Sequence, residues 1–98
     1  MHAINKTEYF ENWFRRLHDF KAKARILARL KRIELGNFGN CEPVGNGIFE
    51  LKIDYGPGYR VYFTRSKGIL IILLNGGDKS SQSNDIKKAK QIATELGV

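Results

Sequence analysis

Residues 48–74 read IFELKIDYGPGYRVYFTRSKGILIILL and carry the pattern of three consecutive β-strands. Apolar and polar side chains alternate over residues 48–54, which is typical of a half-buried strand. The alternation resumes over residues 59–64, after a turn at Tyr-Gly-Pro-Gly, residues 55–58. These two strands are predicted to form an antiparallel hairpin. The uninterrupted apolar run over residues 69–74 predicts a central strand covered on both faces, and the segment 75–79 (NGGDK) is expected to end it.

Helical patterns lie on the N-terminal side of these strands. Thr7 can cap a helix that starts at Glu8, and Asp19 can cap a second helix that runs to about Leu35. Gly36 is the expected stop of the second helix. Apolar residues recur at helical spacing in both, namely Phe10, Trp13, Phe14 and Leu17, then Ile26, Leu27, Leu30 and Ile33. The glycine- and asparagine-rich segment 36–47 that follows is predicted to be irregular.

A third helix is predicted after the strands. Ser80, Ser81 or Ser83 can cap it, and its apolar positions are Ile86, Ala89, Ala93 and Leu96. The fold class is therefore α+β, with an antiparallel sheet and helices packed on one of its faces. The length of 98 residues suits a single domain over residues 1–98.

The chain is strongly basic. Its formal net charge is +7 and its sequence pI is about 9.8, which favours a nucleic-acid partner first, then an anionic membrane or an acidic protein. Cys41 is the only cysteine, so no intramolecular disulfide is expected. No apolar run resembles a signal peptide or is long enough to span a membrane. We expect a cytoplasmic protein.

One face of the predicted hairpin gathers residues suited to phosphate chemistry. Alternation places Glu50, Lys52, Arg60 and Tyr62 together on the face opposite the core. RNA cleavage by 2′-OH attack needs a base, a cation for the pentacovalent phosphorane and an acid for the leaving oxygen. Arg60 suits the second role because its guanidinium matches phosphate oxygens, and Lys52 can stabilise charge or move a proton. The alternative is an ordinary solvated face.

Two other features carry weaker signals. Gly76-Gly77-Asp78-Lys79 before a helix resembles a phosphate-cradling loop, but its spacing is not that of a Walker motif, and a simple strand-to-helix turn explains it as well. Steps of four, four and three residues align a basic stripe on one side of the second predicted helix. The stripe consists of Lys21, Arg25, Arg29 and Arg32. It can bind RNA phosphates or simply be solvated. The two histidines are far apart in the sequence, and no metal site is predicted.

Three segments together resemble a known protein superfamily. They are TEYFENWFRRLHD at residues 7–19, GYRVYF at 58–63 and ILIILLNGGDKSSQSNDIKKAKQIA at 69–93. The chain resembles the RelE/ParE toxin superfamily, and within it the HigB-like, phage-derived Gp49-like addiction module killer proteins. This resemblance implies a RelE-like fold, with two N-terminal helices packed on a twisted antiparallel sheet and a C-terminal helix.

The resemblance also implies a function. It is that of the toxin in a type II toxin–antitoxin system, a ribosome-dependent mRNA endoribonuclease (an mRNA interferase) that blocks translation without a metal or other cofactor. The implied partners are an antitoxin encoded beside it, often a helix-turn-helix protein, and the ribosome with its mRNA. A membrane is not among them, and the implied location is the cytoplasm.

The residues that match the working positions of the RelE branch are Arg60 of the GYR element, Lys52 on the preceding strand and Lys79 after the last strand. Glu50 stands where a second lysine is expected, and Asp85 falls near the position of an expected tyrosine. The general acid is therefore open between Asp85, Tyr62 and a ribosomal group. The predicted catalytic set is Arg60, Lys52, Lys79, Asp85 and Tyr62, with the basic stripe as the surface that binds ribosomal RNA.

Two other functions fit the same residues. A ParE-like inhibitor of DNA gyrase shares the fold and the arginine-bearing strand but performs no chemistry, and Glu50 favours this alternative. Lys52 together with Lys79 favours the nuclease. The net charge alone would also permit a nonspecific RNA- or DNA-binding module.

Overall fold

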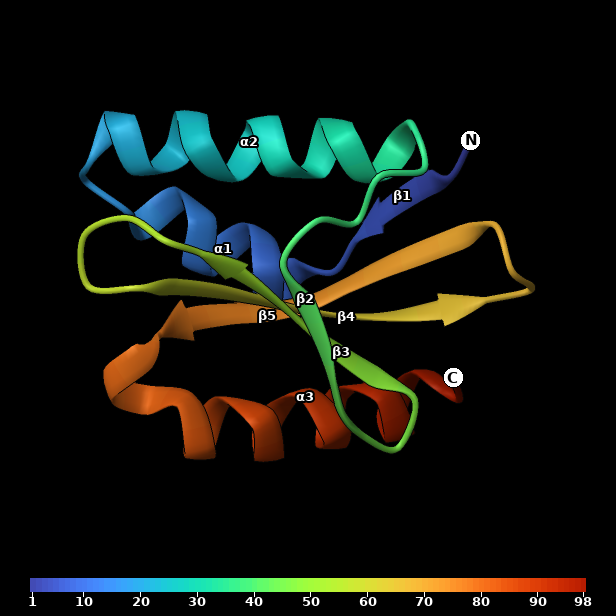
Figure 1. The fold of residues 1–98 in the computed structure, drawn as a ribbon. Coiled ribbons are helices and arrows are strands. Elements are labelled where there is room, and N and C mark those ends of the chain that lie inside the picture. Colours follow the sequence, from blue (N-terminus) through green and yellow to red (C-terminus); the bar gives the residue numbers. More distant parts are fainter.

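A computed structural model describes all residues, 1–98, and shows a five-stranded sheet with helices on both of its faces (Figure 1). The elements in chain order are β1 (Ala3–Lys6), α1 (Glu8–Arg16), α2 (Phe20–Glu34), β2 (Cys41–Gly45), β3 (Ile48–Ile53), β4 (Tyr59–Ser66), β5 (Leu70–Asp78), a 3₁₀ turn (Lys79–Ser81) and α3 (Gln82–Leu96). The predicted α+β class is confirmed. None of the helices has both the length and the apolar character needed to cross a membrane.

The strands lie in the order β1-β5-β4-β3-β2. The predicted hairpin is confirmed, since β3 pairs antiparallel with β4 from Ile48 opposite Thr64 to Ile53 opposite Tyr59. The central strand predicted over 69–74 is confirmed as β5, which lies between β1 and β4, but it continues to Asp78 instead of ending at the 75–79 segment. The sheet is mixed rather than purely antiparallel, because β1 runs parallel to β5.

The prediction that all helices pack on one face is wrong. In Figure 1, α1 and α2 lie on one side of the sheet and α3 lies on the other. On the α3 side, a second buried cluster consists of Ile48, Tyr62, Leu74, Ala89, Ile92 and Ala93. The α1 and α2 side holds the larger cluster, with Phe10, Ile26, Leu30, Ile33, Leu51, Ile53, Val61, Phe63, Ile71 and Leu73. The hairpin strands are therefore covered on both faces over much of their length.

Two edge strands were not predicted from the sequence. Residues 41–45 lie in the segment expected to be irregular, yet they pair with β3, with a register shift between Pro43 and Gly45. The turn that joins β2 to β3 uses left-handed backbone at Asn46 and Gly47. The other missed strand, β1, has the mostly exposed sequence Ala-Ile-Asn-Lys. Both strands are short and lie at an edge, where polar residues and proline are tolerated and the alternation signal is weak.

The predicted caps of the first two helices and the predicted stop of the second are confirmed. The Thr7 hydroxyl accepts a hydrogen bond from the Phe10 amide, and the Asp19 carboxylate accepts from the amides of residues 21 and 22. Beyond the end of α2, Gly36 adopts a left-handed φ of +91°, which favours glycine. Ser81 occupies the cap position of α3, but its hydroxyl donates to the Asp85 side chain rather than capping a backbone amide.

The Gly76-Gly77 pair belongs to β5 and is neither a turn nor a phosphate loop. A Cβ atom at Gly76 would overlap the indole ring of Trp13 on α1. One at Gly77 would overlap the carboxylate of Asp85 on α3. Glycine is therefore required here so that helices on opposite faces can approach the same strand closely.

Candidate functional site

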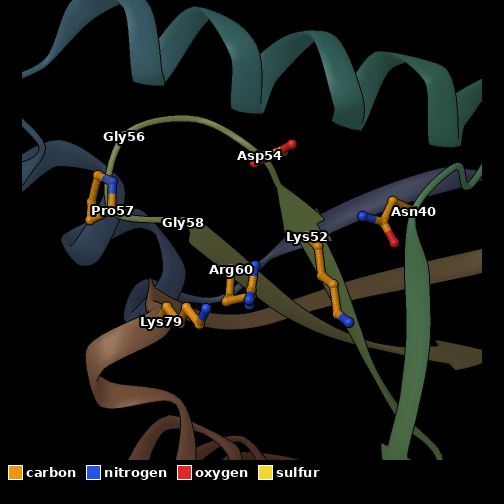
Figure 2. A pocket seen from close by; sticks show the side chains of 8 residues that line it. All are labelled: Asn40, Lys52, Asp54, Gly56, Pro57, Gly58, Arg60 and Lys79. Atoms are coloured by element: carbon orange, nitrogen blue, oxygen red, sulfur yellow. The ribbon is translucent and has the colours of Figure 1, made fainter.

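A polar hollow of about 330 Å³ lies at the end of the sheet where β3 enters the 54–58 loop (Figure 2). Its lining residues are Asn40, Lys52, Asp54, Gly56, Pro57, Gly58, Arg60 and Lys79. The hollow therefore contains three cationic side chains. An anion is the ligand that such a lining favours.

Strand register brings the three cations together. Lys52 on β3 lies directly opposite Arg60 on β4, so their side chains share one face of the sheet. Arg60 in turn lies opposite Gly77 on β5, and Lys79 follows two residues later. Figure 2 shows the Lys79 side chain directed toward Arg60. The structure thus assembles three of the five residues predicted to be catalytic.

Gly58 closes the loop tightly beside these cations. Its φ of +81° is the left-handed conformation that favours glycine. A Cβ atom at this position would lie 3.4 Å from Cβ of Lys79 and 3.9 Å from Nη1 of Arg60. The missing side chain leaves Nη1 of Arg60 open to the hollow.

Arg60 is held at one edge and free at the other. Its side chain is 12% exposed, and its Nε lies 3.8 Å from Oε2 of Glu50. That distance is too long for a hydrogen bond, and the buried Nε has no other partner. No hydrogen bond within the chain engages the Nη groups, which remain accessible from the hollow. They offer the paired donors that bind two phosphate oxygens at once.

Lys52 and Asp54 are oriented differently from Arg60. The Lys52 ammonium lies 3.0 Å from Oε1 of Glu42 on β2, and Figure 2 shows it directed away from Arg60. The Glu42 side chain is 61% exposed, so this ion pair is weak. Asp54 lies on the rim, and its carboxylate points away from Lys52 and Arg60 (Figure 2).

Glu50 and Tyr62 share the face of Lys52 and Arg60, as predicted, but the alternative interpretation, an ordinary solvated face, is wrong for both. Glu50 is 1% exposed and Tyr62 is fully buried, because α3 covers this part of the sheet. The Glu50 carboxylate accepts hydrogen bonds from Nε2 of Gln82 at 2.6 Å and from the Tyr62 hydroxyl at 3.3 Å. Burial and the nearby Glu50 charge raise the pKa of the Tyr62 hydroxyl well above its ordinary value.

Asp85 is not a lining residue of the cationic hollow, but its carboxylate packs over Gly77, which lies opposite Arg60 on the neighbouring strand. It lines a separate hollow of about 440 Å³ between α1 and α3, which also includes Trp13 and Lys88. Burial raises the pKa of its carboxyl, although the hydrogen bond from Ser81 opposes that shift. The general-acid role of Asp85 or of Tyr62 stays a prediction. Asp85 would act from its place over Gly77 on β5, and Tyr62 from its buried place beneath α3.

The basic stripe of α2 divides into two kinds of residue. Arg29 turns inward and donates to the backbone carbonyls of Lys52 at 2.5 Å, Phe38 at 3.3 Å and Asn40 at 3.3 Å. Burial lowers the pKa of Arg29. Arg25 lies over the Tyr55 ring, 4.6 Å from its centroid. The remaining two, Lys21 and Arg32, are exposed.

Several residues of the site had no assigned role in the sequence. Asp54 shares the alternation of Lys52, so its place on the rim was open to prediction. Asn40 precedes an unpredicted strand and gives no signal. Gln82 reaches Glu50 across 32 positions of sequence, a contact that only the packing of α3 creates. No cluster of three or more histidine, cysteine or acidic side chains is arranged to hold a metal ion.

Comparisons with known proteins agree on family and fold. The family model described as phage-derived protein Gp49-like (DUF891) matches residues 12–96. An uncharacterized protein of Haemophilus influenzae is 54% identical over 95 residues, covering 97% of this chain and 96% of that protein. The crystal structure of the isolated Escherichia coli RelE toxin superposes with a TM-score of 0.66 at 13% identity, covering 90% of this chain and 98% of that one. At this identity the RelE structure shows a shared fold.

Proposed function

Given that the chain belongs to the phage-derived Gp49-like family, we propose that it is the toxin component of a type II toxin–antitoxin system. The fold shared with the E. coli RelE toxin supports the proposal, as does the resemblance of segments in all three parts of the chain to addiction module killer proteins. The partner would be an antitoxin, of the helix-turn-helix kind and encoded beside it. Toxin, antitoxin and target would then meet in the cytoplasm.

The activity that the site supports best is endonucleolytic cleavage of mRNA on the ribosome, which blocks translation. The observation that carries this proposal is the hollow lined by three cations and by no large hydrophobic side chain, into which Arg60 presents Nη groups that make no hydrogen bond within the chain. Such a site fits a phosphodiester far better than an apolar ligand. The net charge of +7 would favour approach to the RNA-rich ribosome.

The cations would act mainly by opposing charge. Attack of a ribose 2′-oxygen on the neighbouring phosphorus adds negative charge to the phosphate oxygens. The two Nη groups of Arg60 would hold two of those oxygens, and Lys79 lies beside Arg60 to share the charge. Lys52 would turn from Glu42 toward the phosphate when RNA binds. A ribosomal group would take the proton of the attacking 2′-hydroxyl. As the bond from phosphorus to the 5′-oxygen breaks, that oxygen would receive a proton from Asp85, Tyr62 or a ribosomal group. No step in this scheme needs a metal ion.

The surface of α2 would contribute RNA binding rather than chemistry. Lys21 and Arg32 are exposed and free to contact the ribosomal RNA backbone, whereas Arg29 is engaged in holding the chain together. Within the four-residue stripe, Lys21 and Arg32 would contact RNA, and Arg29 would hold α2 against the neighbouring backbone.

An expression experiment tests the proposal. Induction of the chain alone should arrest bacterial growth, and co-expression of the neighbouring reading frame should restore it. Sequencing of mRNA 5′ ends from arrested cells should show cuts within translated regions. Arrest with intact mRNA and inhibited DNA supercoiling would instead identify a gyrase inhibitor. Normal growth at confirmed soluble expression would reject the toxin proposal.

A further inference from the structure

A buried carboxylate lies next to the proposed phosphate-binding arginine. Glu50 is 1% exposed, although it stands in a position where the resemblance leads one to expect a lysine. A buried carboxylate is costly unless other groups compensate its charge. The only cation whose side chain forms an ion pair with Glu50 is Arg60, across a distance of 3.8 Å.

The carboxylate itself is firmly held. Gln82, at the start of α3, donates to Oε2 of Glu50 at 2.6 Å, and the Tyr62 hydroxyl donates to the same oxygen at 3.3 Å. Tyr62 is fully buried beneath α3, which restricts its movement. The position of Glu50 is thus set by two neutral donors from two different elements.

The arginine, by contrast, has no other anchor. Its Nε is buried and has no hydrogen-bond partner, so the charge of Glu50 is what attracts that edge of the guanidinium. The Nε atom and the two Nη groups lie in one plane. Drawing Nε toward Glu50 therefore leaves the Nη edge turned to the hollow and to Gly58.

From this geometry we infer that Glu50 is a positioning residue: its charge, oriented by Gln82 and Tyr62, fixes the guanidinium of Arg60 with the Nη groups facing the phosphate. The consequence for catalysis rests on the proposed nuclease function. The positioning itself does not, and it can be measured in the free protein. A preorganised guanidinium gives its full benefit in the transition state without reorienting.

The test combines Glu50→Gln with Arg60→Lys in a double-mutant cycle. Glutamine keeps the shape and the acceptor oxygen but loses the charge that attracts Arg60. Single-turnover cleavage at saturating ribosomes should fall by about 10- to 100-fold, as expected for a misplaced group. In the Arg60→Lys background the same change should have little effect, because lysine has no Nε edge to orient. A purely structural Glu50 would lower the rate equally in both backgrounds and would overturn the inference.

Glu42→Gln is the matched control. Glu42 lies opposite Glu50 on the neighbouring strand and also pairs with a cation of the hollow, but its side chain is 61% exposed. Loss of this weak pair should change the rate by less than about fivefold. If Glu42→Gln lowers the rate as much as Glu50→Gln does, overall charge rather than positioning is responsible, and the inference fails.

A readout independent of cleavage uses the Nε–Hε resonance of Arg60 in ¹H–¹⁵N NMR spectra. In the parent protein this resonance should report a rigid side chain. In Glu50→Gln it should shift and become mobile, while that of Arg65 at the other end of β4 stays unchanged. Should Glu50→Gln fail to fold, Gln82→Ala serves in its place and should loosen Arg60 in the same direction.

The two proposals fail in distinguishable ways. A parent protein that cuts no mRNA but shows a rigid Arg60 that Glu50→Gln loosens would reject the nuclease and support the positioning role. An Arg60 resonance that is equally mobile in both proteins would overturn the positioning role, whatever the cleavage assay shows.

Discussion

Replacing Arg60 by alanine should have two separable consequences, one for folding and one for chemistry. Arg60 offers two free Nη groups to the hollow, and its Nε side is the only cationic partner of Glu50. Arg60→Ala therefore removes a phosphate ligand and also leaves a carboxylate that is 1% exposed without a counter-charge. Strand alternation alone places Arg60 on the face opposite the core, where its loss would leave the core intact. The structure changes that expectation.

The size of the folding effect follows from the geometry. At 3.8 Å and an effective dielectric constant of about 20, the attraction between the two charges is about 4 kcal/mol. Gln82 and Tyr62 still stabilise the carboxylate in the variant, so the net loss should lie near the lower end of the range for broken buried pairs, about 3 kcal/mol. The double variant Arg60→Ala/Glu50→Gln removes the orphaned charge and should recover most of that loss.

The chemical effect should not be recovered. Loss of one preorganised donor group to a developing oxyanion typically lowers the rate by about 10²–10³-fold. We expect Arg60→Ala/Glu50→Gln to fold and to cut mRNA at least about 100-fold more slowly than the parent. Arg60→Lys should retain only part of the activity, because an ammonium keeps the charge but not the paired donors. Arg65→Ala, on the same strand but at its other end, should cut at the parent rate.

Urea denaturation followed by the fluorescence of the single tryptophan measures stability, and single-turnover cleavage on programmed ribosomes measures chemistry. If the double variant is as stable as the parent and cuts at the parent rate, the cationic hollow is not the active site. If Arg60→Ala is as stable as the parent, the pair with Glu50 contributes nothing and the reasoning on buried charge is refuted.

Three further predictions follow from packing and titration. Gly76→Ala should lower the free energy of unfolding by about 2–3 kcal/mol, because its Cβ would overlap the Trp13 ring. The same change in a Trp13→Ala background should lower it much less. Equal losses in the two backgrounds would contradict the packing explanation. Arg29→Ala should lower the free energy of unfolding by about 2 kcal/mol, because Arg29 loses its hydrogen bonds to three backbone carbonyls. Lys21 is exposed, so Lys21→Ala should leave stability unchanged and weaken ribosome binding. The opposite pattern would make Arg29 the RNA contact. Burial raises the folded-state pKa of Asp85, so its contribution to stability is present below the unfolded pKa and is lost as pH rises through the folded pKa. Asp85→Asn should therefore gain stability relative to the parent between pH 3 and pH 7, as measured by denaturation at each pH, and a difference that does not grow with pH would contradict the shift.

Local patterns were enough to predict the hairpin and the helix ends. The alternation over β3 and β4 correctly placed Lys52 and Arg60 on one face, because period-two geometry and cross-strand pairing are local properties. The caps Thr7 and Asp19 were readable for the same reason. The edge strand over residues 41–45 was not, since a proline and a glycine within five residues conceal its pairing.

What could not be predicted depends on contacts between distant elements. The polar alternation of Glu50 and Tyr62 was also compatible with a solvated face, yet α3 covers these two residues, whereas Lys52 and Arg60 line the hollow. Glu50 is buried because a helix that begins 32 residues later packs over it, as the Gln82–Glu50 bond illustrates, while the Lys52 and Arg60 side chains stay 24% and 12% exposed. The same packing explains Gly76, whose sequence context suggested a turn.

The central claim is that this chain cuts mRNA on the ribosome with the cationic hollow as its active site. The most direct measurement mixes the purified protein with ribosomes programmed with a defined end-labelled mRNA and determines the position and end groups of the products. We expect cuts in the mRNA at the ribosome, with a 2′,3′-cyclic phosphate or 3′-phosphate on one fragment and a 5′-hydroxyl on the other. We also expect those products to be lost in the stable Arg60→Ala/Glu50→Gln variant. Intact mRNA in the presence of folded protein, or equal cleavage by that variant, would contradict the claim.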